Sequence, residues 1–156
     1  MEDNIQKIYG LIGYSLLAYY HYHHKDNNSQ LILYGYIALA LVYIPWYYNS
    51  EIKHKIETKS QLENEEKIED YLEKIGHSLI SVYYASQLMN KVDLHGVLGF
   101  IGNLLILSKF KKQATMILIG YYILSIIQSH TNIGSLALIL FYYYMLGNYE
   151  SKHTSL

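Results

Sequence analysis

The feature that most constrains the fold of this chain is the uneven distribution of its charged residues. From Gln113 to Tyr149 there is no Asp, Glu, Lys or Arg, whereas 13 of the 25 charged residues lie between Glu51 and Lys74. In a typical globular domain about a quarter of all residues are charged. Because so long an uncharged stretch is unusual in water, the simplest prediction is that it lies in lipid.

The apolar segments predict an all-α fold, namely a polytopic transmembrane helical bundle of about six spans. A spanning helix needs about 20 apolar residues, whereas several runs here are shorter and the mean hydropathy is only +0.04. Two features offset this shortfall: the 19 Tyr residues lower the hydropathy, and flanking turns lengthen the short runs. The predicted spans are residues 5–22, 31–48, 76–90, 94–108, 113–129 and 133–148.

Composition divides the chain into four regions. Residues 1–50 predict a two-helix transmembrane hairpin, residues 51–75 a charged amphipathic helix, residues 76–149 a four-helix bundle and residues 150–156 a polar tail. In the charged region, apolar residues recur mainly at helical spacing. This helix is interpreted most simply as a solvated connector, and the alternatives are a surface helix, a docking site for a partner, or a continuation of the third span.

The lysines predict an orientation for this bundle. With six spans, two lysines, Lys25 and Lys91, lie on one side, and the other ten lie on the opposite side. Lysine is enriched in cytoplasmic loops of membrane proteins. The chain is therefore expected to be an integral membrane protein with both termini in the cytoplasm or its organellar equivalent, in a membrane that the sequence does not identify.

Small residues mark one candidate packing surface. Gly96, Gly99 and Gly102 recur at every third position, which removes side chains from one ridge of a helix and lets another backbone approach closely. The helix that carries them is expected near the centre of the bundle.

Several tyrosines lie near the middle of the predicted spans, away from the membrane interfaces where Tyr is usually enriched. A phenol in an apolar medium must find a hydrogen-bond partner, so these residues are expected to point inward. They could line a polar path or a small-solute pocket; alternatively, each hydroxyl bonds a neighbouring carbonyl and the ring simply packs. The predicted lining residues are Tyr83, Tyr84, Gln87, Asn103, Tyr121, Tyr122, Ser125 and Tyr143.

Histidines gather on the predicted non-cytoplasmic side, and they suggest a second kind of site. Asp26 and Asp93 lie in the turns on the same side. Imidazole and carboxylate are ordinary ligands of zinc, copper and iron, and His95 and His130, with His21 or His24, form the candidate metal site. His95 and His130 could also ligate a haem. The alternative is that these side chains, like the tyrosines around them, are amphipathic groups at an interface.

One stretch resembles a known family. Ser86-Gln87-Leu88, a short turn, and a glycine-rich helix that ends in Gly102-Asn103-Leu104 resemble the three-helix repeat of the PQ-loop transporters, over about a third of the chain. The chain departs from the pattern, because Ser86 replaces the defining Pro and Pro45 is followed by Trp46 instead of Gln. No family is assigned on this resemblance.

No catalytic motif is recognisable: there is no glycine-rich phosphate loop, no His-Glu-x-x-His, no Gly-x-Ser-x-Gly and no Cys. The leading hypothesis is an uncoupled small-solute transporter or channel, or a structural subunit of a membrane complex. The alternative is a membrane enzyme or redox protein that uses a transition metal or haem. The expected partners are the lipid bilayer, a protein docked on residues 51–75 and further copies of the chain. Nucleic acid is not expected, because the net charge is −1.

Overall fold

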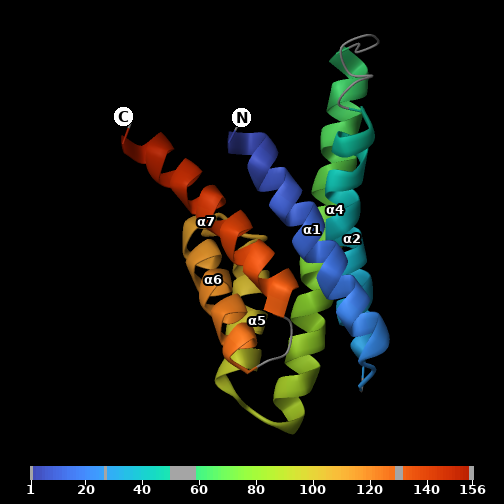
Figure 1. The fold of residues 1–156 in the computed structure, drawn as a ribbon, viewed down its shortest axis with the longest axis vertical. Helices are drawn as coiled ribbons and strands as arrows, with labels where there is room; N and C mark the ends of the chain where they lie inside the picture. Colours follow the sequence, from blue (N-terminus) through green and yellow to red (C-terminus); the bar gives the residue numbers. More distant parts are fainter. Residues whose placement is uncertain (1, 27, 50–58, 129–131, 155–156) are drawn as a thin grey trace.

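The computed structural model describes residues 2–26, 28–49, 59–128 and 132–154, and within them the chain forms six helices. The first three are α1 (Glu2–His23), α2 (Ser29–Asn49) and α4 (Lys59–Asn90). The last three are α5 (Leu94–Leu105), α6 (Lys111–Ile127) and α7 (Asn132–Thr154). Successive helices run in opposite directions, and both ends of the chain lie at the same end of the bundle (Figure 1).

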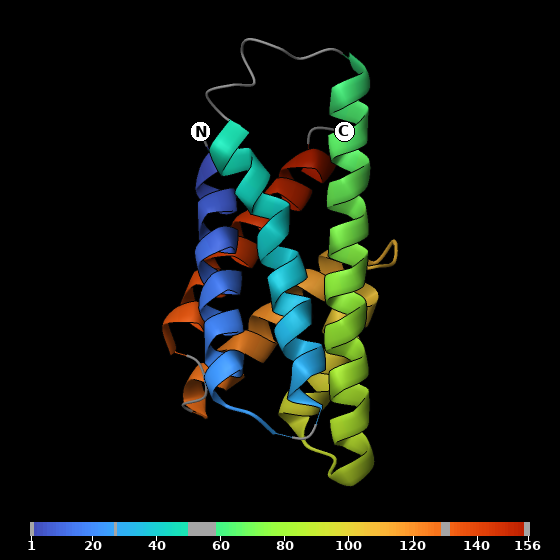
Figure 2. The same cartoon turned by 90° about the vertical axis from the view of Figure 1, so that its right-hand side faces the viewer.

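The six helices form a closed ring. Each helix packs against the next one along the chain, and α7 returns to pack against α1. In Figure 2, α1, α2 and α4 stand side by side at the front, with the later helices behind them. This arrangement matters for function because side chains from helices that are distant in sequence meet inside the ring.

The prediction of a membrane-embedded bundle is wrong. In the part of the chain that the structure describes, no helix combines the length with the apolar character that crossing a bilayer requires. Helices α5 and α6 have 12 and 17 residues, or about 18 and 26 Å at 1.5 Å per residue, against a hydrocarbon core of about 30 Å. The longer helices are interrupted by tyrosine, histidine, amide or charged side chains. This finding contradicts the predicted spans. It also contradicts the predictions that depend on them, namely the integral-membrane localisation and the cytoplasmic placement of both termini.

The boundaries of two predicted elements also change. Helix α4 runs without a break from Lys59 to Asn90, so the described part of the charged helix and the third predicted span are one helix. Residues 51–58 lie outside the described residues. At the other end of the chain, α7 continues to Thr154 and takes in most of the predicted polar tail. The described part of the charged segment thus adds several turns to the start of α4.

The core inside the ring is built largely from aromatic side chains. Its largest fully buried members are Tyr14, Tyr36, Phe141, Tyr122 and Tyr142, which come from α1, α2, α6 and α7. None of the buried side-chain nitrogen or oxygen atoms in the described residues lacks a hydrogen-bond partner. The interior is therefore polar enough to hold hydroxyl groups and is fully satisfied, as a stable polar core must be.

Glycines set how closely the helices approach. A Cβ atom added to Gly35 of α2 would lie 2.8 Å from the carbonyl oxygen of Gly76 of α4, and a Cβ added to Gly76 would lie 2.8 Å from that of Gly35. A methyl group cannot fit there without moving one helix. The predicted glycines of α5 are also closely packed: a Cβ at Gly99 would lie 2.7 Å from Tyr84, and one at Gly102 would lie 2.7 Å from Leu118.

Apolar side chains also cover much of the outside of the ring. Ile12, Leu41, Ile75, Ile123 and Leu136 are each more than two-fifths exposed and come from five different helices. The scarcity of charge is therefore not explained by burial within the chain alone. The same composition forms both the interior of the ring and a large part of its outer surface.

Candidate functional site

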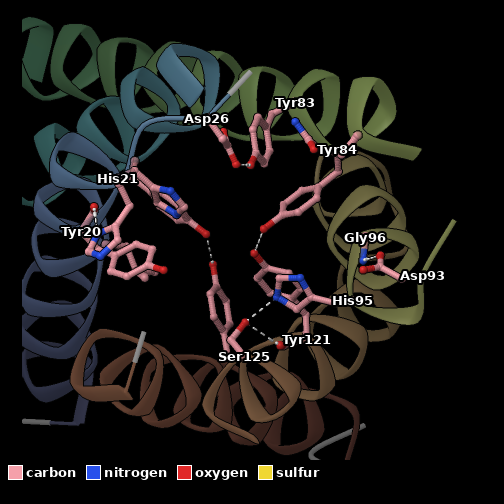
Figure 3. A pocket seen from close by; sticks show the side chains of 15 residues that line it. Tyr20, His21, Asp26, Tyr83, Tyr84, Asp93, His95, Gly96, Tyr121 and Ser125 are labelled. Atoms are coloured by element: carbon pink, nitrogen blue, oxygen red, sulfur yellow. Dashed lines mark hydrogen bonds between the residues drawn. The ribbon is translucent and has the colours of Figure 1, made fainter. Parts of the chain in front are cut away.

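The candidate site is a cavity of about 260 Å³ at one end of the ring, opposite the two chain ends. Side chains from α1, α2, α4, α5 and α6 and from the loop between α1 and α2 surround it. Figure 3 looks into this space, where the labelled side chains from several helices converge. We call it the first cavity. Because its walls come from helices that are distant in sequence, it exists only in the closed ring.

The start of α5 places a histidine in the wall of the first cavity. Asp93 precedes the helix in an extended conformation, and its Oδ1 accepts a hydrogen bond of 2.8 Å from the backbone N–H of Gly96. An aspartate in this position is a standard helix N-cap. Capping fixes the first turn of α5, and His95 in that turn lies with its ring stacked on Tyr121, with the ring centroids 4.5 Å apart.

His95 also contacts Ser125 of α6, and the contact is structural in character. The Nε2 atom of His95 lies 2.7 Å from the Ser125 hydroxyl, which itself donates to the backbone carbonyl of Tyr121 at 3.0 Å. A hydroxyl has a single hydrogen, so Nε2 is the donor in the first of these bonds. An activated serine needs the opposite arrangement, in which the histidine accepts the hydroxyl proton. The pair is therefore not arranged for nucleophilic catalysis.

One of the two aspartates that line the first cavity is Asp26, in the loop between α1 and α2. Its Oδ2 accepts a hydrogen bond of 2.9 Å from the hydroxyl of Tyr83 on α4, and Figure 3 shows the two side chains meeting at the edge of the open space. Burial, followed by this hydrogen bond, raises the pKa of Tyr83. The phenol therefore stays protonated and fixes the direction of the carboxylate.

The carboxylate of Asp93 also borders the first cavity but lies beside α5 (Figure 3). The described residues that line the cavity include these two aspartates and neither Lys nor Arg. The carboxylates of the lining therefore have no lysine or arginine counter-charge within the described wall of the cavity. Since a carboxylate can accept several hydrogen bonds, each aspartate keeps acceptor capacity beyond the bond described.

The remaining wall is aromatic. Tyr84 of α4 and Tyr121 of α6 hydrogen-bond through their hydroxyl groups, and their rings meet edge to face. Tyr36 and Tyr122 form a second hydroxyl pair, 3.2 Å apart. Burial raises the pKa of Tyr36, Tyr84 and Tyr122 well above the ordinary value. All of them therefore remain neutral phenols near neutral pH.

Four buried tyrosines close the inner end of the first cavity, and we call them the tyrosine partition: Tyr14, Tyr36, Tyr122 and Tyr142. Tyr14 and Tyr36 stack on one side, and Tyr122 and Tyr142 stack on the other. Hydroxyl pairs join the two stacks, at 2.6 Å for Tyr14 with Tyr142 and at 3.2 Å for Tyr36 with Tyr122. The partition separates the first cavity from the opposite end of the ring.

The structure brings most of the predicted pocket residues together. Those that line the first cavity are Tyr83, Tyr84, Gln87, Tyr121, Tyr122 and Ser125. Asn103 does not line it; it is fully buried and hydrogen-bonds His77. Tyr143 faces outward and is 64% exposed. For the four tyrosines among them, position in the middle of an apolar segment is the useful signal, whereas Gln87 and Ser125 are predicted only as polar side chains that accompany them. For Tyr143 the same signal fails, because that residue lies on the outer face of α7.

Five residues that line the first cavity are absent from the predicted pocket lining, from the predicted metal site and from the predicted packing glycines: Leu17, Tyr20, Asp26, Tyr36 and Asp93. Tyr36 lies in mid-helix exactly as the selected tyrosines do, so the same argument would have found it. The two aspartates and Tyr20 lie at helix ends, where a polar residue is ordinary. Only the closure of the ring turns those helix ends toward a common space.

The predicted histidines are partly brought together. His21, His24 and His95 line the first cavity, whereas His130 lies outside the described residues. Over the described ranges, no group of three or more His, Cys, Asp or Glu side chains is placed to hold a metal ion. The proposed haem pair of His95 and His130 depends on a residue that the structure does not describe.

Comparison with protein-family models, with curated proteins and with solved structures gave no significant match. The geometry and chemistry of the first cavity are therefore the basis for a functional proposal.

Proposed function

We propose that this protein binds a small organic cation, such as an amine or a quaternary ammonium compound, in the first cavity. The observation that carries the proposal is the lining: carboxylates and neutral tyrosine rings surround the space, and neither Lys nor Arg is present among the described lining residues. Aromatic faces attract a cation through the ring quadrupole, by about 0.5–2 kcal/mol for each well-placed ring.

The positions of the charged and aromatic groups support the same class of ligand. Asp26 is held in place by Tyr83 and supplies the counter-charge. The stacked pair of His95 and Tyr121 and the ring of Tyr84 form a wall across the space from it (Figure 3). A ligand that presents a positive group to Asp26 would therefore place its apolar portion against aromatic faces. The volume of about 260 Å³ lies near the lower end for ligand pockets, which suits a small molecule.

The experiment is a calorimetric titration of the purified 156-residue chain with matched ligands. Choline and butylamine are the cationic probes; the uncharged counterparts are butanol and the alcohol in which carbon replaces the quaternary nitrogen of choline. We expect at least one cation to bind about tenfold more tightly than its counterpart, which corresponds to about 1.4 kcal/mol. Xylitol is the third comparison, because aromatic pockets with carboxylates also bind polyols.

Variants connect binding to the cavity. Asp26→Asn keeps the size and the acceptor for Tyr83 and removes the charge, so we expect it to weaken cation binding about tenfold. Asp70→Asn is the control, because it removes the same charge from an exposed position on α4 at the other end of the ring. Equal binding of a cation and its counterpart, tighter binding of xylitol, or equal losses in the two variants would each show that the proposal is wrong.

A further inference from the structure

A second cavity, also of about 260 Å³, lies at the opposite end of the ring, beyond the tyrosine partition. Tyr14 and Tyr142 of the partition form part of its wall, together with side chains from the first half of α4 and the second half of α7. Its lining differs from that of the first cavity, because both acidic and basic side chains are present. The two cavities are therefore suited to different ligands.

Four charged side chains line the second cavity, and two of them, of opposite charge, do not pair with each other. Glu73 of α4 is half-buried, and Lys111 is the first residue of α6. Each influences the other electrostatically, yet within the described residues no direct ion pair joins them. The other two charged side chains of the lining, Lys74 and Asp70, do pair, at 2.9 Å, and both are exposed. A half-buried carboxylate without a close counter-ion is costly, and a cationic group in the cavity would reduce that cost.

His77 adds a fixed hydrogen-bond acceptor. The side-chain amide nitrogen of Asn103 donates to the carbonyl oxygen of Gly99 at 2.8 Å, so the amide oxygen faces His77, whose Nδ1 lies 2.8 Å from it. An amide oxygen only accepts, and Nδ1 must therefore carry the proton. In the neutral ring this leaves a lone pair on Nε2. His77 is 6% exposed and lines the second cavity.

Apolar side chains also line the second cavity, beside the charged groups and two further tyrosines, Tyr43 and Tyr149. They are Leu39, Ile106, Leu107, Phe141 and Met145, from α2, the end of α5 and α7. A ligand that fits this cavity would therefore carry a positive group, a negative group and an apolar portion. These are the parts of an α-amino acid with an apolar side chain.

We propose that the second cavity is a binding site for a small zwitterion, namely an α-amino acid with an apolar side chain. The ammonium group of the ligand is held by Glu73 and by the Nε2 acceptor of His77. Its carboxylate faces Lys111, and its side chain lies against the apolar wall. This proposal does not depend on cation binding in the first cavity, because the two sites share only the tyrosine partition.

The test is a calorimetric titration of the 156-residue chain with L-leucine, L-methionine and L-phenylalanine. Two analogues of leucine each lack one charged group: isoamylamine has no carboxylate and isocaproate has no ammonium group. We expect at least one of the amino acids to bind, and for leucine we expect at least a tenfold loss of affinity with each analogue. The absence of binding by all three amino acids would overturn the proposal. The titrations are repeated with Asp26→Asn, in which cation binding in the first cavity is weakened, and equal binding of leucine and isoamylamine in that variant would overturn the proposal as well.

Matched variants locate the site. Glu73→Gln and Lys111→Gln each remove one charge from the cavity, and each is expected to weaken amino-acid binding about tenfold or more. Lys112→Gln also removes one positive charge, but from the next position, which does not line the cavity. The affinity of this variant for the amino acid should be unchanged. Circular dichroism confirms that each variant is folded before titration. An equal loss in Lys111→Gln and Lys112→Gln would overturn the assignment of the carboxylate site, whatever happens in the first cavity.

Discussion

The hydroxyl oxygens of Tyr36 on α2 and Tyr122 on α6 lie 3.2 Å apart inside the ring. These two helices are not neighbours in the ring, in which α2 packs on α1 and α4 while α6 packs on α5 and α7. The hydrogen bond therefore crosses the interior and joins opposite walls. Both side chains are at most 1% exposed. The pair ties the two halves of the fold together at the level of the tyrosine partition.

This pair predicts a measurable loss of stability. Tyr36→Phe leaves the Tyr122 hydroxyl without this partner, so we expect the free energy of unfolding to fall by about 1 kcal/mol. Tyr34→Phe is the control, because Tyr34 is 55% exposed on the same helix, and its effect should be below about 0.5 kcal/mol. Urea denaturation of both variants and of the double variant with Tyr122→Phe measures the coupling. Fully additive losses for Tyr36 and Tyr122 would contradict the contact.

The crossing of α2 and α4 predicts opposite results for two glycine-to-alanine changes. In Gly35→Ala the new Cβ would lie 2.6 Å from Ile80 and 2.8 Å from the backbone oxygen of Gly76, and relieving such a clash costs about 1–3 kcal/mol. In Gly120→Ala nothing lies within 4 Å of the new Cβ. Alanine is favoured over glycine in a helix by about 1 kcal/mol, so this variant should be more stable than the parent. Thermal unfolding of both variants decides the point, and a Gly35→Ala protein as stable as Gly120→Ala would refute the close approach.

His77 predicts a dependence of stability on pH. Burial lowers the pKa of His77 from 6.5 to about 4, outweighing the opposing effect of the hydrogen bond to Asn103. Between these values the unfolded chain binds a proton that the folded chain excludes. The contribution of His77 is therefore fully present above about pH 6.5 and is lost as the pH falls toward 4, by an amount on the order of 3 kcal/mol.

The measurement compares urea denaturation at pH 7 and pH 5 for the parent and for His77→Gln. The variant is expected to be less stable at pH 7 but to lose less stability than the parent on acidification. A pH dependence that is the same in His77→Gln and the parent would contradict the burial of a neutral imidazole.

The buried tyrosines predict a second loss of stability, in alkali. Burial raises the pKa of Tyr14, Tyr36, Tyr84 and Tyr122 well above the ordinary value of 10.0. Because the folded state holds these protons more tightly than the unfolded state does, their contribution is present below about pH 10 and is lost as the pH rises further.

We therefore expect the buried phenols to ionise together with unfolding. Tyrosinate absorbance and circular dichroism, recorded over the same alkaline titration, should show one late step that coincides in both signals. Complete ionisation of all tyrosines while the helical signal is unchanged would show that the phenols are accessible in the fold, and would contradict the buried partition.

The sequence alone determined that the chain is helical, where most helices lie, and that mid-segment tyrosines turn inward. Helical spacing and the scarcity of turn residues within the apolar segments are local properties. They can therefore be recognised without knowledge of which helices pack against one another. The same properties identified Tyr83, Tyr84, Tyr121 and Tyr122 as interior residues. They could not separate these from Tyr143, because the face of a helix that turns inward is set by its neighbours.

Tertiary structure decided the rest. The absence of charge from Gln113 to Tyr149 predicted lipid as the solvent, and that inference failed because helix length and unbroken apolar character, not charge alone, determine whether a helix can cross a bilayer. Only the closed ring brings Asp26 to Tyr83 and Glu73 to the cavity that Lys111 lines. The physical reason is that these contacts join helices distant in sequence, and their geometry depends on the close crossings that the glycines permit.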